Sequence, residues 1–144
     1  MTRFTSDSPP VPHVVFVCEH GAAKSVLAAT YFNHLAQQRG LSIRALARGT
    51  SPDLEIPHPV VAGLAREGFA PCTPAPTRLD VNDLANAWKV VTFDQPQVAA
   101  LVPASSAVVA WNELPPVSDD FDSAREVIFS KVEALIEESG RCDK

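Results

Sequence analysis

The chain has 144 residues, of which 46% are hydrophobic, and this is enough apolar material to fill the core of one ordinary domain. Its formal charge of −5 comes from interleaved acidic and basic residues, which argues against partners such as nucleic acid or an anionic membrane surface. Any anionic ligand must therefore be held by a local arrangement of donors.

The first residues are polar and end in Pro-Pro, without the apolar run of a signal peptide or a membrane helix. We expect residues 1–12 to be a disordered lead-in to one domain over 13–140, and we expect the chain to be cytoplasmic. Cys18, Cys72 and Cys142 lack the spacing of a disulfide scaffold or a metal site, so free thiols are expected. The histidines are dispersed, and no metal or cofactor is predicted.

Hydrophobic periodicity predicts alternating strands and helices along the chain. The continuous apolar run at 14–17 predicts a buried first strand over 13–18. Apolar residues at intervals of three and four then predict a helix over 24–39, which Gly40 ends. The same reasoning predicts strands at 43–47, 89–93 and 107–111, and helices at 59–67, 81–87, 97–102 and from 118 onward. Such alternation implies a parallel sheet covered by helices on both faces.

The loop after the first strand carries the strongest functional signal. In open α/β sheets ligands bind outside the carboxyl ends of the strands. A loop that enters a helix also points several backbone amides at one centre, where the helix dipole adds positive charge. We therefore predict an oxyanion site here, with the Lys24 ammonium as a further donor. The predicted anion-binding residues are Glu19, His20, Gly21, Ala22, Ala23 and Lys24.

Cys18 is the candidate nucleophile of this loop. The positive helix end and the nearby lysine favour the thiolate, and the Ser25 hydroxyl is placed to donate to it. Gly21 suits a sharp turn because glycine tolerates positive φ. Glu19 is expected to point away from the sulfur, and His20 either contacts the anion or hydrogen-bonds a loop carbonyl. The alternative is an ordinary strand-to-helix turn in which the cysteine is a small buried hydrophobe.

The loop resembles the signature of the low-molecular-weight protein tyrosine phosphatases and of the arsenate reductases that share their fold. That signature reads Cys, five residues, Arg, Ser, and residues 18–25 match it except that Lys24 replaces the arginine. Residues 48–52 are similar to the family's stretch after the second strand, and Trp111 precedes the final helix as in the family. The resemblance implies a doubly wound, flavodoxin-like three-layer fold with four parallel strands in the order 2-1-3-4.

The resemblance implies a cysteine-dependent phosphatase that hydrolyses phosphate monoesters of the phosphotyrosine kind through a Cys18 phosphoenzyme. Lysine is a point charge where arginine offers a planar fork, so slow turnover or an altered reaction is expected. The family's general acid, an aspartate after the fourth strand, is replaced by Pro115. The candidate substitutes are Glu113, Asp119 and Asp120, with Asp119 favoured, although the two aspartates also suit a helix N-terminus.

Two other functions stay open beside the phosphatase. An arsenate reductase would use Cys18 to attack arsenic, and His20 resembles that branch of the family. Because residues 92–96 lack the cysteines of an internal relay, such an enzyme would need an external small thiol. A non-catalytic module would bind phosphate or a phosphorylated partner without turnover, and a plain scaffold would bind neither. Cys72 and Cys142 are expected to be incidental, and the sequence predicts neither the physiological substrate nor the oligomeric state.

Overall fold

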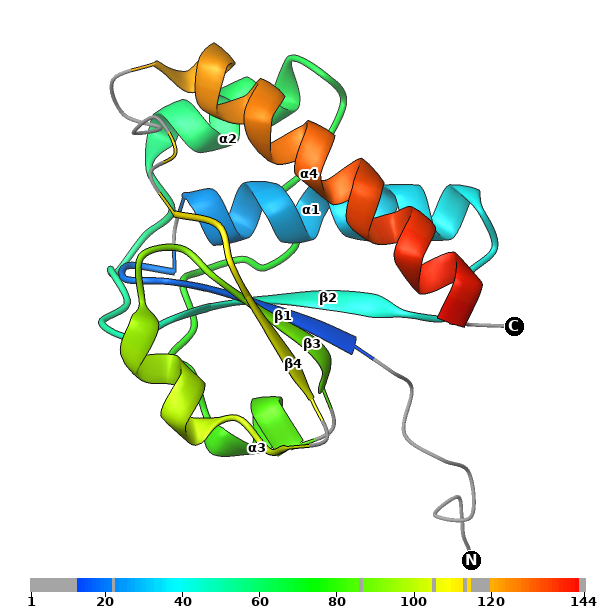
Figure 1. Ribbon diagram of the computed structural model, residues 1–144. Helices are drawn as coiled ribbons and strands as arrows, with labels where there is room; N and C mark the ends of the chain where they lie inside the picture. The colour runs from blue at the N-terminus through cyan, green and yellow to red at the C-terminus, as the bar shows by residue number, and fades with distance from the viewer. Residues whose placement is uncertain are drawn as a thin grey trace, which may run out of the picture.

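The computed structural model has the predicted three-layer α/β/α architecture (Figure 1). It describes residues 13–21, 23–85, 87–104, 106–112, 114 and 120–142. The strands are β1 (His13–Cys18), β2 (Arg44–Gly49), β3 (Ala87–Thr92) and β4 (Ala107–Ala110). They form one parallel sheet in the order β2-β1-β3-β4, so the predicted order is confirmed.

Helices cover both faces of this sheet (Figure 1). One face carries α1 (Lys24–Gln38), α2 (His58–Ala65) and α4 (Phe121–Cys142). The other face carries α3 (Val81–Ala85) and the 3₁₀ helix η1 (Pro96–Leu101). Within the described part of the chain, no helix combines the length and the apolar character that a membrane span requires.

Several element boundaries differ from the prediction. β2 runs on to Gly49 because it pairs with β1 as far as Cys18, so Gly49 belongs to the strand and not to the turn. The short helix ends at Ala85, since Ala87 already pairs with His13 as the first residue of β3. The final helix runs to Cys142, two residues beyond the predicted end of the domain at residue 140. Residues 118 and 119, where that helix was predicted to begin, lie outside the described residues.

The central strand β1 is buried on both faces, as its apolar run predicts. Val14, Phe16 and Cys18 belong to the core cluster beneath α1 and α4, whereas Val15 and Val17 pack into the cluster on the opposite face. Because side chains alternate along a strand, the register of β1 directs the last one, Cys18, toward the layer that contains α1. The position of the sulfur is therefore set by the packing of the whole strand.

A polar contact joins the three helices that cover this face. Glu67, just after α2, accepts a hydrogen bond from Nη2 of Arg125 on α4 at 2.7 Å and a second from its Nε. The Tyr31 hydroxyl on α1 donates to the same carboxylate at 3.2 Å. The Arg125 hydrogen bonds hold the pKa of Glu67 below its ordinary value, and burial, more than the nearby carboxylate, raises the pKa of Tyr31 to about 12. The folded state therefore favours an ionised Glu67.

We expect Glu67→Gln to lower the free energy of unfolding at pH 7 by about 1 kcal/mol, since the contact is charged but partly open to solvent. A carboxyl whose pKa is depressed by folding stabilises the protein above its unfolded pKa, and that contribution is lost as the pH falls through the folded pKa. The difference between wild type and variant in urea denaturation should therefore shrink below the ordinary carboxyl pKa of 4.5. Glu133→Gln, at an exposed position of α4, is the matched control. A gap that widens on acidification would contradict this assignment.

Candidate active site

The loop after β1 is fixed to the chain after β2 by backbone hydrogen bonds. The carbonyl of Cys18 accepts from the Thr50 amide at 3.1 Å, and that of Glu19 accepts from the Ser51 amide at 2.7 Å. The carbonyl of His20 accepts from the Asp53 amide at 3.1 Å. Three successive carbonyls of the loop therefore face the segment that follows β2.

These bonds decide where the amides of the loop point. In a trans peptide unit the carbonyl and the following N–H point in opposite directions. The N–H groups of residues 19, 20 and 21 are therefore directed away from the segment after β2, toward the interior of the loop. The Gly21 amide shows this orientation, since it donates to Cys18 Sγ at 3.2 Å. The interior of the loop is consequently lined with hydrogen-bond donors.

The sulfur of Cys18 is buried beside these donors. Its residue is 7% exposed and Ser25 is fully buried, and Cys18 Sγ is 3.1 Å from Ser25 Oγ. The Gly21 amide donates to the sulfur and the Ser25 hydroxyl lies within hydrogen-bond distance of it, so an ionised sulfur would have two donors beside it. Ala23 at the N-cap of α1 offers no side-chain acceptor, so the first amides of the helix stay available to a ligand. Ala22 lies outside the described residues.

The loop and β2 approach each other so closely that both contact positions must be glycine. Gly21 has φ 61°, and a Cβ atom there would lie 2.8 Å from the backbone nitrogen of Gly49. A Cβ at Gly49 would lie 2.6 Å from the nitrogen of Gly21. Neither distance leaves room for a carbon atom. The identity of both residues is thus set by the geometry that turns the amides inward.

The Lys24 ammonium is held at the edge of the site by a carboxylate. Its Nζ lies 3.8 Å from Oδ2 of Asp94, and the lysine side chain is only 21% exposed. Asp94 is the second residue after β3 and has the left-handed conformation, with φ 59°, and its amide donates to Asn112 Oδ1 at 2.9 Å. A non-glycine residue in this conformation is uncommon and marks a position that its surroundings hold in place. The Lys24 ammonium is therefore already close to a carboxylate before any anion binds.

Asp94 is a site residue that the sequence analysis missed. Its neighbour Gln95 accepts a hydrogen bond from the Thr50 hydroxyl at 2.8 Å, so the segments after β2 and β3 are joined beside the loop. The position of Asp94 at the carboxyl end of a central strand was the available signal, because ligand sites in such sheets lie there.

The side chains of Glu19 and His20 lie at the surface of the loop, and each is more than half exposed. Within the part of the loop that the structure describes, the neighbours of the His20 imidazole are carboxylates and not a loop carbonyl. Its Nδ1 is 3.1 Å from Oδ1 of Asp53, and its Nε2 is 3.8 Å from Oε1 of Glu19. Glu19 points outward as expected, and its side chain is 61% exposed. These two residues face the interior of the loop only through their backbone amides.

Of the candidate general acids, only Asp120 is described. Both its carboxylate oxygens accept from Ser123, from the amide at 3.1 Å and from the hydroxyl at 2.8 Å. These bonds lower its pKa, so Asp120 is an ionised cap at the start of α4 and is poorly suited to donate a proton. Glu113 and Asp119 lie outside the described residues, and Asp119 remains the predicted acid.

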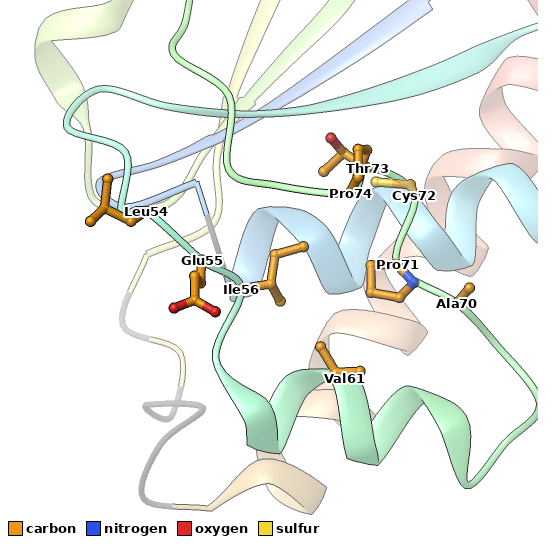
Figure 2. A pocket seen from close by; sticks show the side chains of 9 residues that line it. All are labelled: Leu54, Glu55, Ile56, Val61, Ala70, Pro71, Cys72, Thr73 and Pro74. Carbon is orange, nitrogen blue, oxygen red and sulfur yellow. The ribbon is translucent and has the colours of Figure 1, made fainter.

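The second thiol of the described chain lies in a separate groove of about 550 Å³ (Figure 2). Cys72 lines it, between the segment after β2 and the segment after α2. Desolvation raises the pKa of the Cys72 thiol, although the residue as a whole is exposed. A thiol of this kind is a weak nucleophile, which supports an incidental role. The other lining residues are Leu54, Glu55, Ile56, Val61, Ala70, Pro71, Thr73 and Pro74.

The sequence of the whole folded region decides the family. Residues 13–141 match the profile of the low molecular weight phosphotyrosine protein phosphatases. The chain belongs to this family. None of the curated proteins compared with the chain matches it. Among the described residues of this family member, no three His, Cys, Asp or Glu side chains come together as metal ligands.

Solved structures show the same fold at low sequence identity. YfkJ from Bacillus subtilis is 19% identical, with a TM-score of 0.81 over 94% of this chain and 99% of that one. The low molecular weight protein tyrosine phosphatase from T. tengcongensis is 17% identical, with a TM-score of 0.77 over 88% of this chain and 99% of that one. A thioredoxin-dependent arsenate reductase from Corynebacterium glutamicum is 24% identical, with a TM-score of 0.77 over 94% of this chain. The matched region spans 65% of that reductase.

The contact between the two glycines yields a direct test. We expect Gly21→Ala to lower the free energy of unfolding by about 2 to 4 kcal/mol and to weaken phosphate binding, because strain and a backbone clash act together. Gly40→Ala is the matched control, since Gly40 has φ 69° but nothing lies within 4 Å of an added Cβ. It should cost only about 1 kcal/mol and leave phosphate binding intact. Denaturation and calorimetric titration with phosphate measure both effects, and equal behaviour of the two variants would contradict the close approach.

Proposed function

We propose that the chain is a cysteine-dependent phosphatase that hydrolyses phosphate monoesters, with phosphotyrosine-like substrates. The observation that carries this proposal is the convergence of the Gly21 amide and the Ser25 hydroxyl on Cys18 Sγ, inside a loop whose amides point the same way. Such an arrangement stabilises an ionised sulfur and a phosphoryl group above it. Family membership supports the same reaction class.

In the proposed reaction the Cys18 thiolate attacks phosphorus. The S–P bond forms as the P–O bond to the leaving group breaks, and the leaving oxygen takes a proton from Asp119. The amides of residues 19–24 and the Lys24 ammonium hold the three equatorial oxygens. A water molecule then hydrolyses the phosphocysteine, which releases inorganic phosphate and regenerates the thiolate. We place the activity in the cytoplasm, because the nucleophile must stay reduced.

The carboxylate of Asp94 reduces the positive charge that Lys24 offers to a bound anion. In the free protein the ammonium is already 3.8 Å from a carboxylate, so its charge is shared before an anion binds. Arginine at this position could contact two phosphate oxygens with one planar group, whereas lysine offers a single centre. We therefore expect a slow enzyme whose anion binding depends mainly on the backbone amides.

Arsenate reduction is the second candidate, supported by the structural likeness to an arsenate reductase. Cys18 would attack arsenate and displace water or hydroxide to form an S–As bond. A small external thiol would then attack the cysteine sulfur, so that arsenic leaves as arsenite and a mixed disulfide remains. A second thiol would reduce that disulfide. The sequence from β3 to Asn112 contains no cysteine that could replace the external thiol.

An aryl phosphate assay tests the phosphatase directly. We expect Cys18→Ser to abolish turnover and Lys24→Arg to raise kcat/KM by about tenfold or more, because the second donor of the fork is restored. Cys72→Ser is the control and should have the wild-type rate.

The outcomes separate the candidate functions. Turnover that survives Cys18→Ser rejects the phosphoenzyme. Phosphate binding without turnover, and with no phosphocysteine on rapid quench, identifies a binding module. Arsenite release that depends on an added thiol, in the absence of phosphate ester hydrolysis, identifies an arsenate reductase.

A further inference from the structure

Carboxylates from three neighbouring segments lie around the loop of residues 18–25, which is the proposed anion site. Glu19 comes from the loop itself, Asp53 from the segment after β2 and Asp94 from the segment after β3. Their side chains are 61%, 47% and 52% exposed, respectively. The Asp53 amide donates to the His20 carbonyl at 3.1 Å and the Asp94 carboxylate lies 3.8 Å from Lys24 Nζ, so both segments adjoin the loop that follows Cys18. We call these three half-exposed carboxylates the acidic rim of the loop.

Among the described residues, the cations near this rim do not balance its three carboxylates. Lys24 is paired with Asp94, so its charge is already matched. Arg78 is exposed and donates to the Thr50 carbonyl at 3.2 Å, and within the described residues it forms no ion pair with Glu19, Asp53 or Asp94. The uncharged form of His20 leaves Glu19 and Asp53 uncompensated on either side of its ring. Glu55 adds a further exposed carboxylate two residues beyond Asp53 (Figure 2).

The rim and the interior of the loop therefore prefer opposite charges. The interior holds a phosphoryl group through inward amides, whereas the rim repels acidic groups that approach with it. A substrate fits both only if the phosphoryl group is anionic and its surroundings are cationic. The carboxylates do not create the anion site; they select among the molecules that the loop can hold.

We propose, on the basis of the phosphatase function proposed above, that the substrates are phosphorylated peptides with lysine or arginine beside the phosphorylated residue. The side chains of Glu19 and Asp53 contact these flanking cations. Because the carboxylates are about half exposed, their effect acts mainly on association and weakens as salt screens it. A phosphopeptide with acidic flanks is the disfavoured substrate.

Two phosphotyrosine peptides of equal length, one with lysine and one with glutamate on both sides of the phosphotyrosine, test this inference. At pH 8 and low ionic strength we expect kcat/KM to be roughly tenfold higher for the lysine peptide, and the ratio to approach one in about 0.5 M salt. The double variant Glu19→Gln, Asp53→Asn should reduce the ratio at least threefold, chiefly because the glutamate peptide reacts faster. Glu133→Gln removes the same kind of charge from an exposed position of α4 and should leave the ratio unchanged.

Equal rates for the two peptides, or a ratio that the double variant does not change, would overturn the inference. Binding to Cys18→Ser, measured by fluorescence anisotropy with the same labelled peptides, keeps the test separate from catalysis. If neither peptide is hydrolysed but Cys18→Ser still binds the lysine peptide several times more tightly, the phosphatase function fails and the charge preference stands. Equal dissociation constants there would refute the preference itself.

Discussion

The close approach of the backbone at Gly21 to the backbone at Gly49 is the constraint on which the site depends. Because these two backbone segments are in contact, the amides after β2 can donate to the carbonyls of Cys18, Glu19 and His20. Their outward direction forces the following N–H groups inward. The burial of β1 on both faces then fixes the cysteine beneath those groups. The conformation of the loop and the position of Cys18 thus both follow from one packed strand and one close backbone contact.

The buried part of the candidate site and its surface carry opposite kinds of charge. The buried sulfur is surrounded by donors, whereas the half-exposed side chains above it are mostly acidic. Lys24 stands between the two regions and already has a partner in Asp94. The same loop therefore combines inward backbone donors with half-exposed side chains that are mostly acidic.

The sheet and its order were predictable because hydrophobic periodicity and the family's loop signature both report on the packing of β1 and α1. The contact between Cys18 and Ser25 was predictable for the same reason, since the loop that holds them is continuous in sequence. Asp94 and Asp53 were missed because their partners, Lys24 and His20, lie far away in the chain and meet them only at the sheet edge. The early start of β3 was missed because helix propensity near Ala87 is overridden by pairing with β1.

Alkylation of the free protein by iodoacetamide near neutral pH, with each cysteine followed by mass spectrometry, tests the central claim most directly. The inward amides should make Cys18 the fastest-reacting thiol, while Cys72, whose pKa is raised by desolvation, reacts slowly. Millimolar phosphate should protect Cys18 and leave the rate at Cys72 unchanged, because the anion covers only the first sulfur. If Cys18 reacts no faster than Cys72, and phosphate protects neither, the donors do not converge on an ionised sulfur and the account is wrong.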